Sequence, residues 1–246
     1  VFGKTNIPIS LADFQSYNDV YGTTNNPFDH SKGSGGSSGG SAAALAAGLT
    51  GLEIGSDIGG SIRNPAHFCG VFGHKPTHSL LWMKGHAALP GVHAMPDISV
   101  IGPLARSAQD LRTSLDLLAG PDPIVARGYR LDMPDLGARK LSDLRIGIWR
   151  SAENYPVAKE VEARVDLVAS ALRDAGAQID ESSRPGFEAD DSHKIYQHLL
   201  HATMASRMPD ESYSTLVEHV KSLSPEDDSD AARVFRGQVS SFRDWS

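Results

Sequence analysis

The sequence predicts an α/β fold on three observations. Residues 144–149 (LRIGIW) alternate apolar and polar side chains as a strand does, and residues 177–180 (AQID) offer a second strand. Apolar residues between them recur at helical spacing and stop near Gly176: Val157, Val161, Val165, Val168 and Leu172. Strand, helix and strand in this order predict a βαβ unit, the building block of an α/β sheet.

The N-terminal third contains two glycine-rich turns. Residues 1–9 (VFGKTNIPI) predict a short strand-like segment, and residues 10–32 have the Asn, Gly and Pro content of a loop. The block GSGGSSGGS at 33–41 leads straight into SAAALAAGL, whose Ala and Leu residues favour a helix. A second glycine turn, GSDIGGSIRNP, follows at 55–65. The first block therefore lies at a helix N-terminus and is not a tether, and two such turns predict backbone brought close to a ligand.

The remaining elements are helices. Ser107 to Asp110 resemble a capping box, and the leucines that follow at helical spacing predict a helix over 107–119 that Gly120 ends. From about residue 190 the chain is mainly helical in pattern, with a solvated acidic loop at 226–230.

Composition excludes several functional classes. The chain has 246 residues, 40% of them hydrophobic, and a net charge of -7 without a basic stripe, so we expect no nucleic-acid partner. The longest weakly polar run, 41–54, is shorter than the ~20 residues that a bilayer requires, so we expect no membrane span. The single cysteine, Cys69, allows no internal disulfide and favours a cytoplasmic location.

The glycine turns favour anion binding, since small residues let backbone N–H groups converge at a helix N-terminus. The first block lacks the Lys of a phosphate-binding loop and the last glycine of a dinucleotide fingerprint. Serine chemistry remains, with Ser37 and Ser38 in one block and Ser61 in the other, although the Gly-x-Ser-x-Gly elbow of α/β-hydrolases is absent.

Residues 35–77 (GGSSGGSAAALAAGLTGLEIGSDIGGSIRNPAHFCGVFGHKPT) resemble the signature of the amidase signature family, with Ser37 and Ser61 at that family's spacing of 24 positions. The similarity extends from GKTNIP near the start to IGPLARSAQDL at 101–111, and more loosely beyond. It implies one amidase signature domain over 1–246, with the signature core at 1–120 and a more variable region at 121–246. The implied fold is a mixed β-sheet core covered by α-helices on both sides.

The resemblance also implies a Ser-cisSer-Lys mechanism without a cofactor. Ser61 would be the nucleophile, and Ser37, after a cis peptide at Gly36, would bridge it to a neutral lysine. The backbone N–H groups of Ile58, Gly59, Gly60 and Ser61 would form the oxyanion hole. Five further residues would support the site from behind: Gly36, Ser38, Ser56, Asp57 and Arg63. Asp57 and Arg63 would pair and fix the turn.

The catalytic lysine of the family would lie several dozen residues before the glycine block, beyond the start of this chain. Lys4, Lys32 and Lys75 are poor candidates for that base. The sequence therefore predicts an internal fragment of a longer enzyme, lacking the N-terminal part with the lysine and a C-terminal part, and inactive by itself.

Plainer interpretations apply to several residues. Helix capping is favoured over catalysis for Ser38 and Ser41, and Cys69 in FCGVF is expected to be a small buried residue. The histidine pairs His74/His78 and His198/His201 lack a matching carboxylate cluster, so no metal site is expected.

The function predicted by the resemblance is hydrolysis of a small carboxylic amide to an acid and ammonia or an amine, with a homodimer as an allowed assembly. One alternative is the glutamine-hydrolysing A subunit of a tRNA-dependent amidotransferase, which is disfavoured because residues 78–100 do not resemble that protein. The other alternative is a non-catalytic remnant that keeps the scaffold without the base.

Overall fold

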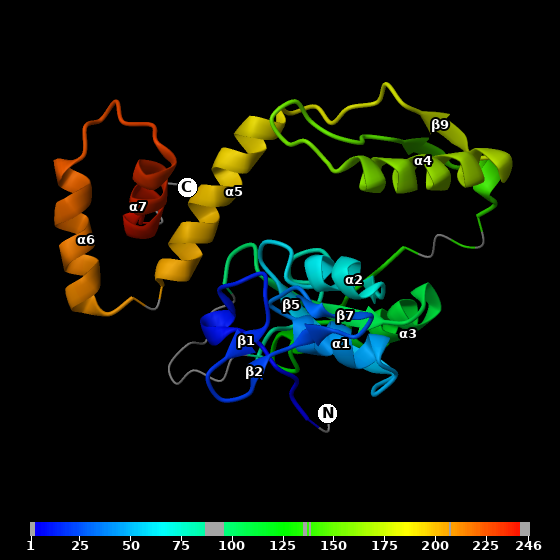
Figure 1. Cartoon of the computed structure of the whole chain (residues 1–246), viewed down its shortest axis with the longest axis horizontal. Helices are drawn as coiled ribbons and strands as arrows, with labels where there is room; N and C mark the ends of the chain where they lie inside the picture. Colours follow the sequence, from blue (N-terminus) through cyan, green and yellow to red (C-terminus); the bar gives the residue numbers. More distant parts are fainter. Residues whose placement is uncertain (1–2, 87–95, 135–136, 138, 207, 242–246) are drawn as a thin grey trace. The chain divides into compact units, whose positions relative to one another are not determined.

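The structure is a computed structural model that describes residues 3–86, 96–134, 137, 139–206 and 208–241 (Figure 1). The chain divides into two compact units, Val1–Asp132 and Met133–Ser246. The resemblance places the boundary between signature core and variable region at residue 120. That is twelve positions before the boundary between the two units. Among the described residues, no helix is both long and apolar enough to cross a bilayer.

The first unit begins with two small antiparallel hairpins. Strand β1 (Tyr17–Asn18) pairs with β2 (Gly22–Thr23), and β3 (Asn25–Asn26) pairs with β4 (Asp29–Gly33). The expected strand over residues 1–9 is wrong for the described residues 3–9, where the chain is irregular and enters a 3-10 helix at Ile9–Leu11. These residues support the glycine block through their backbone instead, since the Asn6 carbonyl accepts the Gly40 N–H at 3.2 Å.

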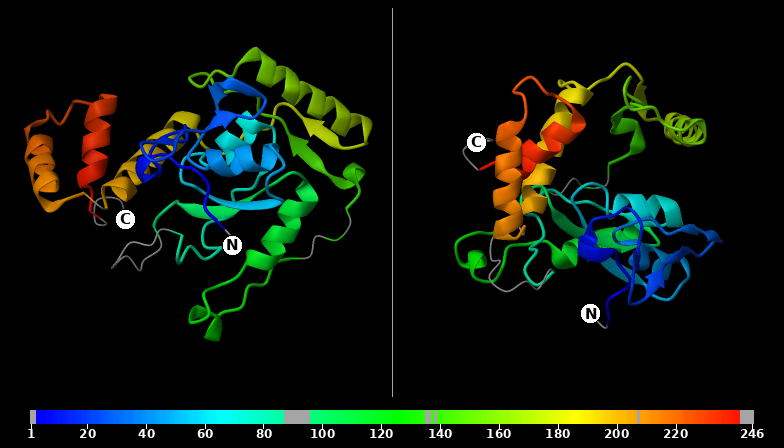
Figure 2. Two further views of the ribbon diagram at one scale, coloured as in Figure 1. Left: turned by 60° about the horizontal axis from the view of Figure 1, so that its bottom comes forward. Right: turned by 60° about the vertical axis from the view of Figure 1, so that its left-hand side comes forward.

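A three-stranded antiparallel sheet, in the order β5-β7-β6, forms the centre of this unit. Its strands are β5 (Leu52–Asp57), β6 (Phe72–Gly73) and β7 (Val100–Ala105). Three helices accompany it: α1 (Gly39–Ala46), α2 (Arg63–Cys69) and α3 (Ala108–Leu118). Figure 2 shows α1 and α2 above the strands in its left view, with α3 below them.

Because side chains alternate along each strand, the two faces of the sheet lie against different helices. Gly55 lies opposite Gly102, and both approach the α1–α2 side, where side chains at these positions would meet Ser38 and Ile62. Leu52 and Ile54 point the other way, toward α3. Helices thus cover both faces, which confirms the α/β class and places the glycine turns and the core on the α1–α2 side.

The core on that side is small and tightly packed. It consists of seven buried residues: Ala42, Ala43, Leu45, Ile62, Ala66, Cys69 and Leu104. Four of them are alanine or cysteine, so helices α1 and α2 pack close to each other and to the sheet. The Ala-rich helix predicted after the glycine block is confirmed as the inner layer of this unit.

Helix α3 confirms the predicted start near Ser107. The Ser107 hydroxyl accepts the Asp110 N–H at 3.0 Å, as in a capping box. The Asp110 carboxylate accepts the Ser107 hydroxyl proton at 2.7 Å rather than the backbone N–H that completes such a box. Two short 3-10 helices follow, Val125–Arg127 and Leu141–Asp143, the second of them in the second unit.

The second unit contains the predicted βαβ motif. Strands β8 (Arg145–Gly147) and β9 (Gln178–Asp180) are parallel and are joined through α4 (Lys159–Asp174). The predicted apolar face is slightly wrong, because Val168 is 57% exposed while Ala169 is buried at 2%. Positions 161, 165, 169 and 172 keep helical spacing, so the buried face is rotated by one residue.

The chain ends in three helices, as the pattern beyond residue 190 predicts: α5 (Ala189–Ala205), α6 (Asp210–Ser222) and α7 (Asp230–Val239). Helix α7 packs against both α5 and α6 (Figure 1). The acidic loop at 226–230 is tied by two arginines of α7. Arg236 donates to the carbonyls of Asp227 and Ser224, and Arg233 forms an ion pair with Asp228 at 3.1 Å.

We predict that Leu104→Ala lowers the free energy of unfolding by about 2–5 kcal/mol, because it opens a cavity in a core with 0% exposure at that position. Leu117→Ala is the matched control, since Leu117 is 77% exposed, and it should change the free energy by less than ~0.5 kcal/mol. Urea unfolding followed by circular dichroism measures both values. Equal losses for the two variants would contradict this description of the core.

Candidate active site

The two glycine turns are joined directly by hydrogen bonds. The Ser38 N–H donates to the Ser61 carbonyl at 3.1 Å, and the Ser56 N–H donates to the Ser38 hydroxyl at 3.3 Å. The Gly36 N–H donates to Asn64 Oδ1 at 3.1 Å. Two segments about twenty residues apart in sequence are thus one structural unit, as the two glycine turns predict.

Glycine is required where the turns touch. A Cβ at Gly35, where φ is +77°, would lie 2.7 Å from Asn64 Oδ1 and 2.9 Å from Pro65 Cα. A Cβ at Gly55 would lie 2.5 Å from the Ser38 hydroxyl. Any side chain at either position would push the turns apart, which explains the composition of both blocks.

Ser37 and Ser61 both lie inside this unit. Ser37 is 1% exposed and Ser61 is 6% exposed, and the Gly36–Ser37 peptide bond is cis, as the resemblance implies. Neither hydroxyl forms a hydrogen bond within the part of the chain that the structure describes. Their neighbours in the first block differ, since the Ser34 and Ser41 hydroxyls bond to the Gly35 carbonyl and Thr5 Oγ1 respectively.

Ser56 is the third buried serine of the two blocks whose hydroxyl forms no hydrogen bond among the described residues. It is 8% exposed, and its backbone N–H holds Ser38. Because successive side chains of a strand point to opposite faces, Ser56 points to the face opposite Asp57. Ser56 therefore contributes through its backbone, and Ser37 and Ser61 are left as the two hydroxyls available for chemistry in the turns.

The turn that carries Ser61 is built around the carboxylate of Asp57. This side chain is fully buried and accepts backbone N–H groups from Gly60 at 2.8 Å, Ile62 at 3.1 Å and Arg63 at 3.4 Å. Arg63 closes the arrangement with two parallel bonds, from Nε at 3.0 Å and from Nη2 at 2.8 Å. The predicted pairing of Asp57 with Arg63 is confirmed.

These contacts keep Asp57 ionised. Burial raises its pKa, but the hydrogen bonds and charge of Arg63, together with the amides of Ile62 and Arg63, outweigh burial and lower the pKa below its ordinary value. A buried carboxylate with this many donors fixes the backbone from residue 57 to residue 63, and with it the position of Ser61.

The four amides expected to form the oxyanion hole differ in their hydrogen-bond partners. Four amides were expected to point at the developing negative charge, from Ile58, Gly59, Gly60 and Ser61. The Gly60 N–H donates to Asp57 Oδ1 at 2.8 Å. The other three amides donate to no group among the described residues, and they could serve as donors.

The helix-capping interpretation of Ser38 and Ser41 is wrong. Ser38 occupies the N-cap position of α1, but its hydroxyl makes no capping bond and instead accepts from the Ser56 amide. The Ser16 hydroxyl accepts the Gly39 N–H at 3.0 Å, and the Asn6 carbonyl accepts the Gly40 N–H. The cap of α1 therefore comes from distant segments of the chain.

Neither composition nor spacing predicts the roles of Ser16, Asn6 and Asn64. Ser16 and Asn6 lie in the irregular segment before the glycine block, where no local pattern distinguishes them. Asn64 follows Arg63 directly, so its place inside the second turn was the only available signal. Their common role is to satisfy backbone groups of the first turn.

Cys69 is confirmed as a small core residue. It is 0% exposed, its sulfur lies 3.4 Å from the Ser34 carbonyl oxygen, and burial raises the pKa of the thiol to about 11. A thiol that stays protonated at neutral pH is a poor nucleophile.

The lysines of the first unit have other partners. Lys75 Nζ donates to the Pro76 carbonyl at 3.0 Å, and Lys32 forms an exposed ion pair with Asp29 at 3.5 Å. Lys4 lies at the edge of a separate groove. No lysine described in the first unit forms a hydrogen bond with Ser37 or Ser61.

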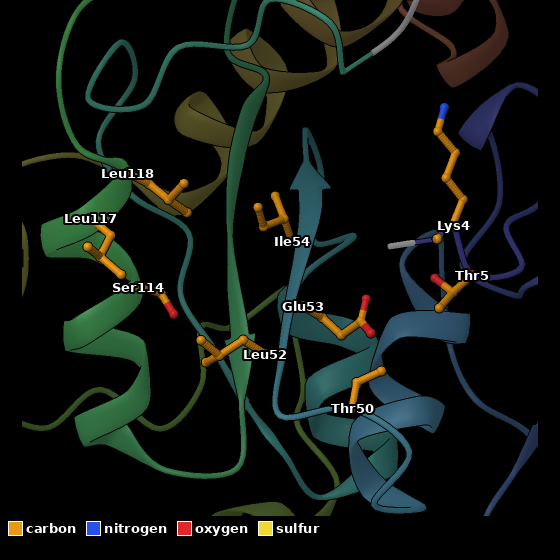
Figure 3. A pocket seen from close by; sticks show the side chains of 10 residues that line it. Lys4, Thr5, Thr50, Leu52, Glu53, Ile54, Ser114, Leu117 and Leu118 are labelled. Atoms are coloured by element: carbon orange, nitrogen blue, oxygen red, sulfur yellow. The ribbon is translucent and has the colours of Figure 1, made fainter. Parts of the chain in front are cut away.

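That groove, of about 400 Å³, lies between β5 and α3 (Figure 3). Leu52, Ile54, Leu117 and Leu118 form its apolar wall, and Glu53 lies on the side of Lys4 and Thr5. None of the predicted site residues lines it. The volume of this groove therefore does not identify it as the active site. The candidate active site is identified by the two hydrogen-bonded glycine turns.

Comparisons with known proteins agree with the sequence resemblance. The family profile described as Amidase matches residues 1–237. The A subunit of glutamyl-tRNA(Gln) amidotransferase from Gloeobacter violaceus is 37% identical over 190 residues, covering 76% of this chain and 38% of that protein. Its counterpart from Deinococcus radiodurans is 40% identical over 194 residues, again covering 76% of this chain and 38% of that protein. The chain thus spans 38% of the length of these relatives.

Solved structures show the same likeness. Fatty acid amide hydrolase superposes with a TM-score of 0.65 at 27% identity, covering 82% of this chain and 36% of that chain. The A subunit of glutamyl-tRNA(Gln) amidotransferase from Thermotoga maritima gives a TM-score of 0.69 at 26% identity, covering 88% of this chain and 47% of that chain. The 6-aminohexanoate cyclic dimer hydrolase gives a TM-score of 0.69 at 26% identity, covering 99% of this chain and 51% of that chain.

Asp57→Asn should lower the free energy of unfolding by about 3 kcal/mol at neutral pH, because Asn offers one acceptor oxygen to donors arranged around two and removes the negative charge that Arg63 faces. The wild-type advantage should be constant above the ordinary Asp pKa of ~3.9 and should shrink as pH falls through the lowered pKa of the folded state. Urea unfolding between neutral and acid pH measures it.

Asp116→Asn serves as the control, because the Asp116–Arg112 pair is exposed and 3.9 Å apart. Its effect should stay below ~1 kcal/mol at every pH. A pH-independent difference between wild type and Asp57→Asn would argue against an ionised Asp57 at the centre of the turn.

Proposed function

The chain belongs to the amidase signature family, and on this premise we propose that its two glycine turns form the acyl-transfer centre of an enzyme that hydrolyses a small carboxylic amide. The observation that carries the proposal is the junction of the turns. It brings Ser37 and Ser61 into one buried unit, where both hydroxyls remain without a hydrogen-bond partner among the described residues while Ser34, Ser38 and Ser41 are bonded.

The chemistry follows from this arrangement. Ser61 Oγ attacks the amide carbonyl carbon as its proton passes to Ser37, and the carbonyl oxygen becomes an oxyanion near the amides of Ile58, Gly59 and Ser61. Ser37 delivers a proton to the departing nitrogen as the C–N bond breaks, which leaves an ester on Ser61 and releases ammonia or an amine. Water then attacks the ester and releases the acid. No step requires a cofactor.

A base must accept the proton from Ser37, and the family resemblance assigns this role to a lysine. A lysine in that role must be neutral to accept a proton, so it needs a buried site that lowers its pKa. The described lysines of the first unit form no hydrogen bond with the two serines, so the base is proposed to come from chain outside these 246 residues.

The runner-up function within the same chemistry is glutamine hydrolysis in a tRNA-dependent amidotransferase. The curated relatives named as the A subunit of such an enzyme, at 37% and 40% identity, favour it. The solved relatives named as hydrolases favour a free-standing amidase. The preference for a free-standing amidase rests on the segment 78–100. This segment lies partly outside the described residues. Copurification with partner subunits would favour the amidotransferase.

We predict that Ser61→Ala, in the protein expressed from its complete gene, lowers amide turnover by about 10⁴-fold or more, because it removes the nucleophile. Mass spectrometry after a substrate pulse should show an acyl group on the peptide containing Ser61 in the wild type and none in the variant. Ser114→Ala is the control: Ser114 is also buried, and its hydroxyl donates to the Asp110 carbonyl at 2.8 Å within α3.

Ser114→Ala should keep turnover within about twofold of wild type. Turnover that survives Ser61→Ala would contradict the proposed nucleophile, and a wild-type protein that turns over neither simple amides nor glutamine would support the remnant hypothesis.

The 246-residue chain alone should show no Ser61-dependent amide hydrolysis, because no lysine described in the first unit is hydrogen-bonded to either serine. Assays of this chain beside the product of the complete gene, with a panel of simple amides, test this expectation. Turnover by the short chain that Ser61→Ala abolishes would show that a base is present within it.

A further inference from the structure

We propose that Ser16 is a positioning residue that fixes the peptide of Ser37 for proton transfer, an inference that rests on the proposed amidase function. Ser16 lies in the irregular segment before the first glycine block and is 1% exposed. It belongs to neither glycine turn, and the family signature at 35–77 does not include it.

Residues 34–39 form a bend around Ser37, and the Ser16 hydroxyl bonds to backbone groups of this bend on both sides of Ser37. Its oxygen accepts the Gly39 N–H at 3.0 Å, and its proton can be donated to the Ser37 carbonyl at 3.1 Å or to the Gly35 carbonyl at 3.2 Å. One hydroxyl thus satisfies the first amide of α1 and a carbonyl of the bend. Both groups are buried, so water does not replace this hydroxyl without a change in packing.

Packing reinforces the hydrogen bonds. A Cβ at Gly36 would lie 2.6 Å from the Gln15 nitrogen and 2.8 Å from the Asp13 carbonyl oxygen, and a Cβ at Gly39 would lie 2.9 Å from Ser16 Cβ. The segment 13–16 therefore presses on one side of the bend. Asn64, which accepts the Gly36 N–H, holds another part of the same bend from the second turn.

Ser16 is itself held in place. Its carbonyl accepts the Thr24 N–H at 2.8 Å, and the Thr24 carbonyl accepts the Ser34 N–H at 3.3 Å. This chain of hydrogen bonds returns to the residue that begins the bend. Ser16 thereby connects the segment before the hairpins to both ends of the turn, and its position does not depend on the Ser37 side chain.

Loss of the Ser16 hydroxyl should affect one chemical step more than the others. It would leave the Gly39 N–H and a carbonyl of the bend buried without partners, so the Ser37 peptide could rotate. Ser37 must deliver a proton to the departing nitrogen of an amide, whereas a p-nitrophenolate leaves without a proton. Misplacement of Ser37 should therefore slow amide cleavage more than cleavage of the p-nitrophenyl ester of the same acid.

The test is Ser16→Ala in the protein expressed from its complete gene, assayed with an amide and the p-nitrophenyl ester of one acyl group. We expect kcat for the amide to fall about tenfold more than kcat for the ester, within the ~10²–10⁴-fold range of general acid–base catalysis. Ser114→Ala, at a buried serine whose hydroxyl also bonds to backbone, should leave the amide-to-ester ratio unchanged.

A purely structural role for Ser16 would lower both rates in proportion to the folded fraction, which thermal melting measures, and an unchanged ratio would overturn the proposal. If Ser16→Ala does not fold, Ser16→Cys, whose thiol is a weaker donor and acceptor, should give a smaller shift of the ratio in the same direction. Wild-type protein without Ser61-dependent turnover would instead refute the proposed function.

Discussion

The buried carboxylate of Asp57 is the interaction on which the candidate site depends. Strand β5 delivers it to the end of the sheet, and five hydrogen bonds from the following residues close the chain around it. A charge at 0% exposure is stable only when donors surround it, so the backbone of residues 58–63 has little freedom. This turn fixes the position of Ser61. The Gly60 amide is one of the donors to this carboxylate.

The first turn is positioned by different means. It contains no charge, and its polar groups are satisfied by neutral partners from three separate segments: Ser16, Asn64, and the Asn6 carbonyl. Close approach of these partners requires glycine, because a Cβ at Gly39 would overlap Ser16 and a Cβ at Gly40 would overlap the Asn6 backbone. The block that resembles a flexible linker in composition is therefore among the most constrained parts of the unit, with every residue from 34 to 43 buried.

The sequence predicted what depends on local or signature patterns. Periodicity identified the βαβ unit, the helix after Ser107 and the helical C-terminal region, and the resemblance identified the Asp57–Arg63 pair. Contacts between distant segments could not be predicted, since Ser16 and Asn6 lie in a loop without periodicity, and their partners are backbone atoms that leave no trace in residue type. The error at Ser38 has the same origin: a serine before a helix is expected to cap it, but here the adjacent strand takes its hydroxyl and Ser16 supplies the cap.

Within the first glycine block, hydrogen bonding distinguishes Ser37 from the other serines. A hydroxyl with a backbone partner is held in one orientation, whereas a hydroxyl without a partner is free to bond with a substrate or a base. In the first block Ser34, Ser38 and Ser41 are of the first kind, and Ser37 is of the second kind among the described residues. Ser61 has the same character in the second block, on a turn whose rigidity comes from Asp57. Two such hydroxyls can be kept in one buried unit only where other contacts stabilise both turns, and the bonds of Asp57, Ser16 and Asn64 supply that stability here.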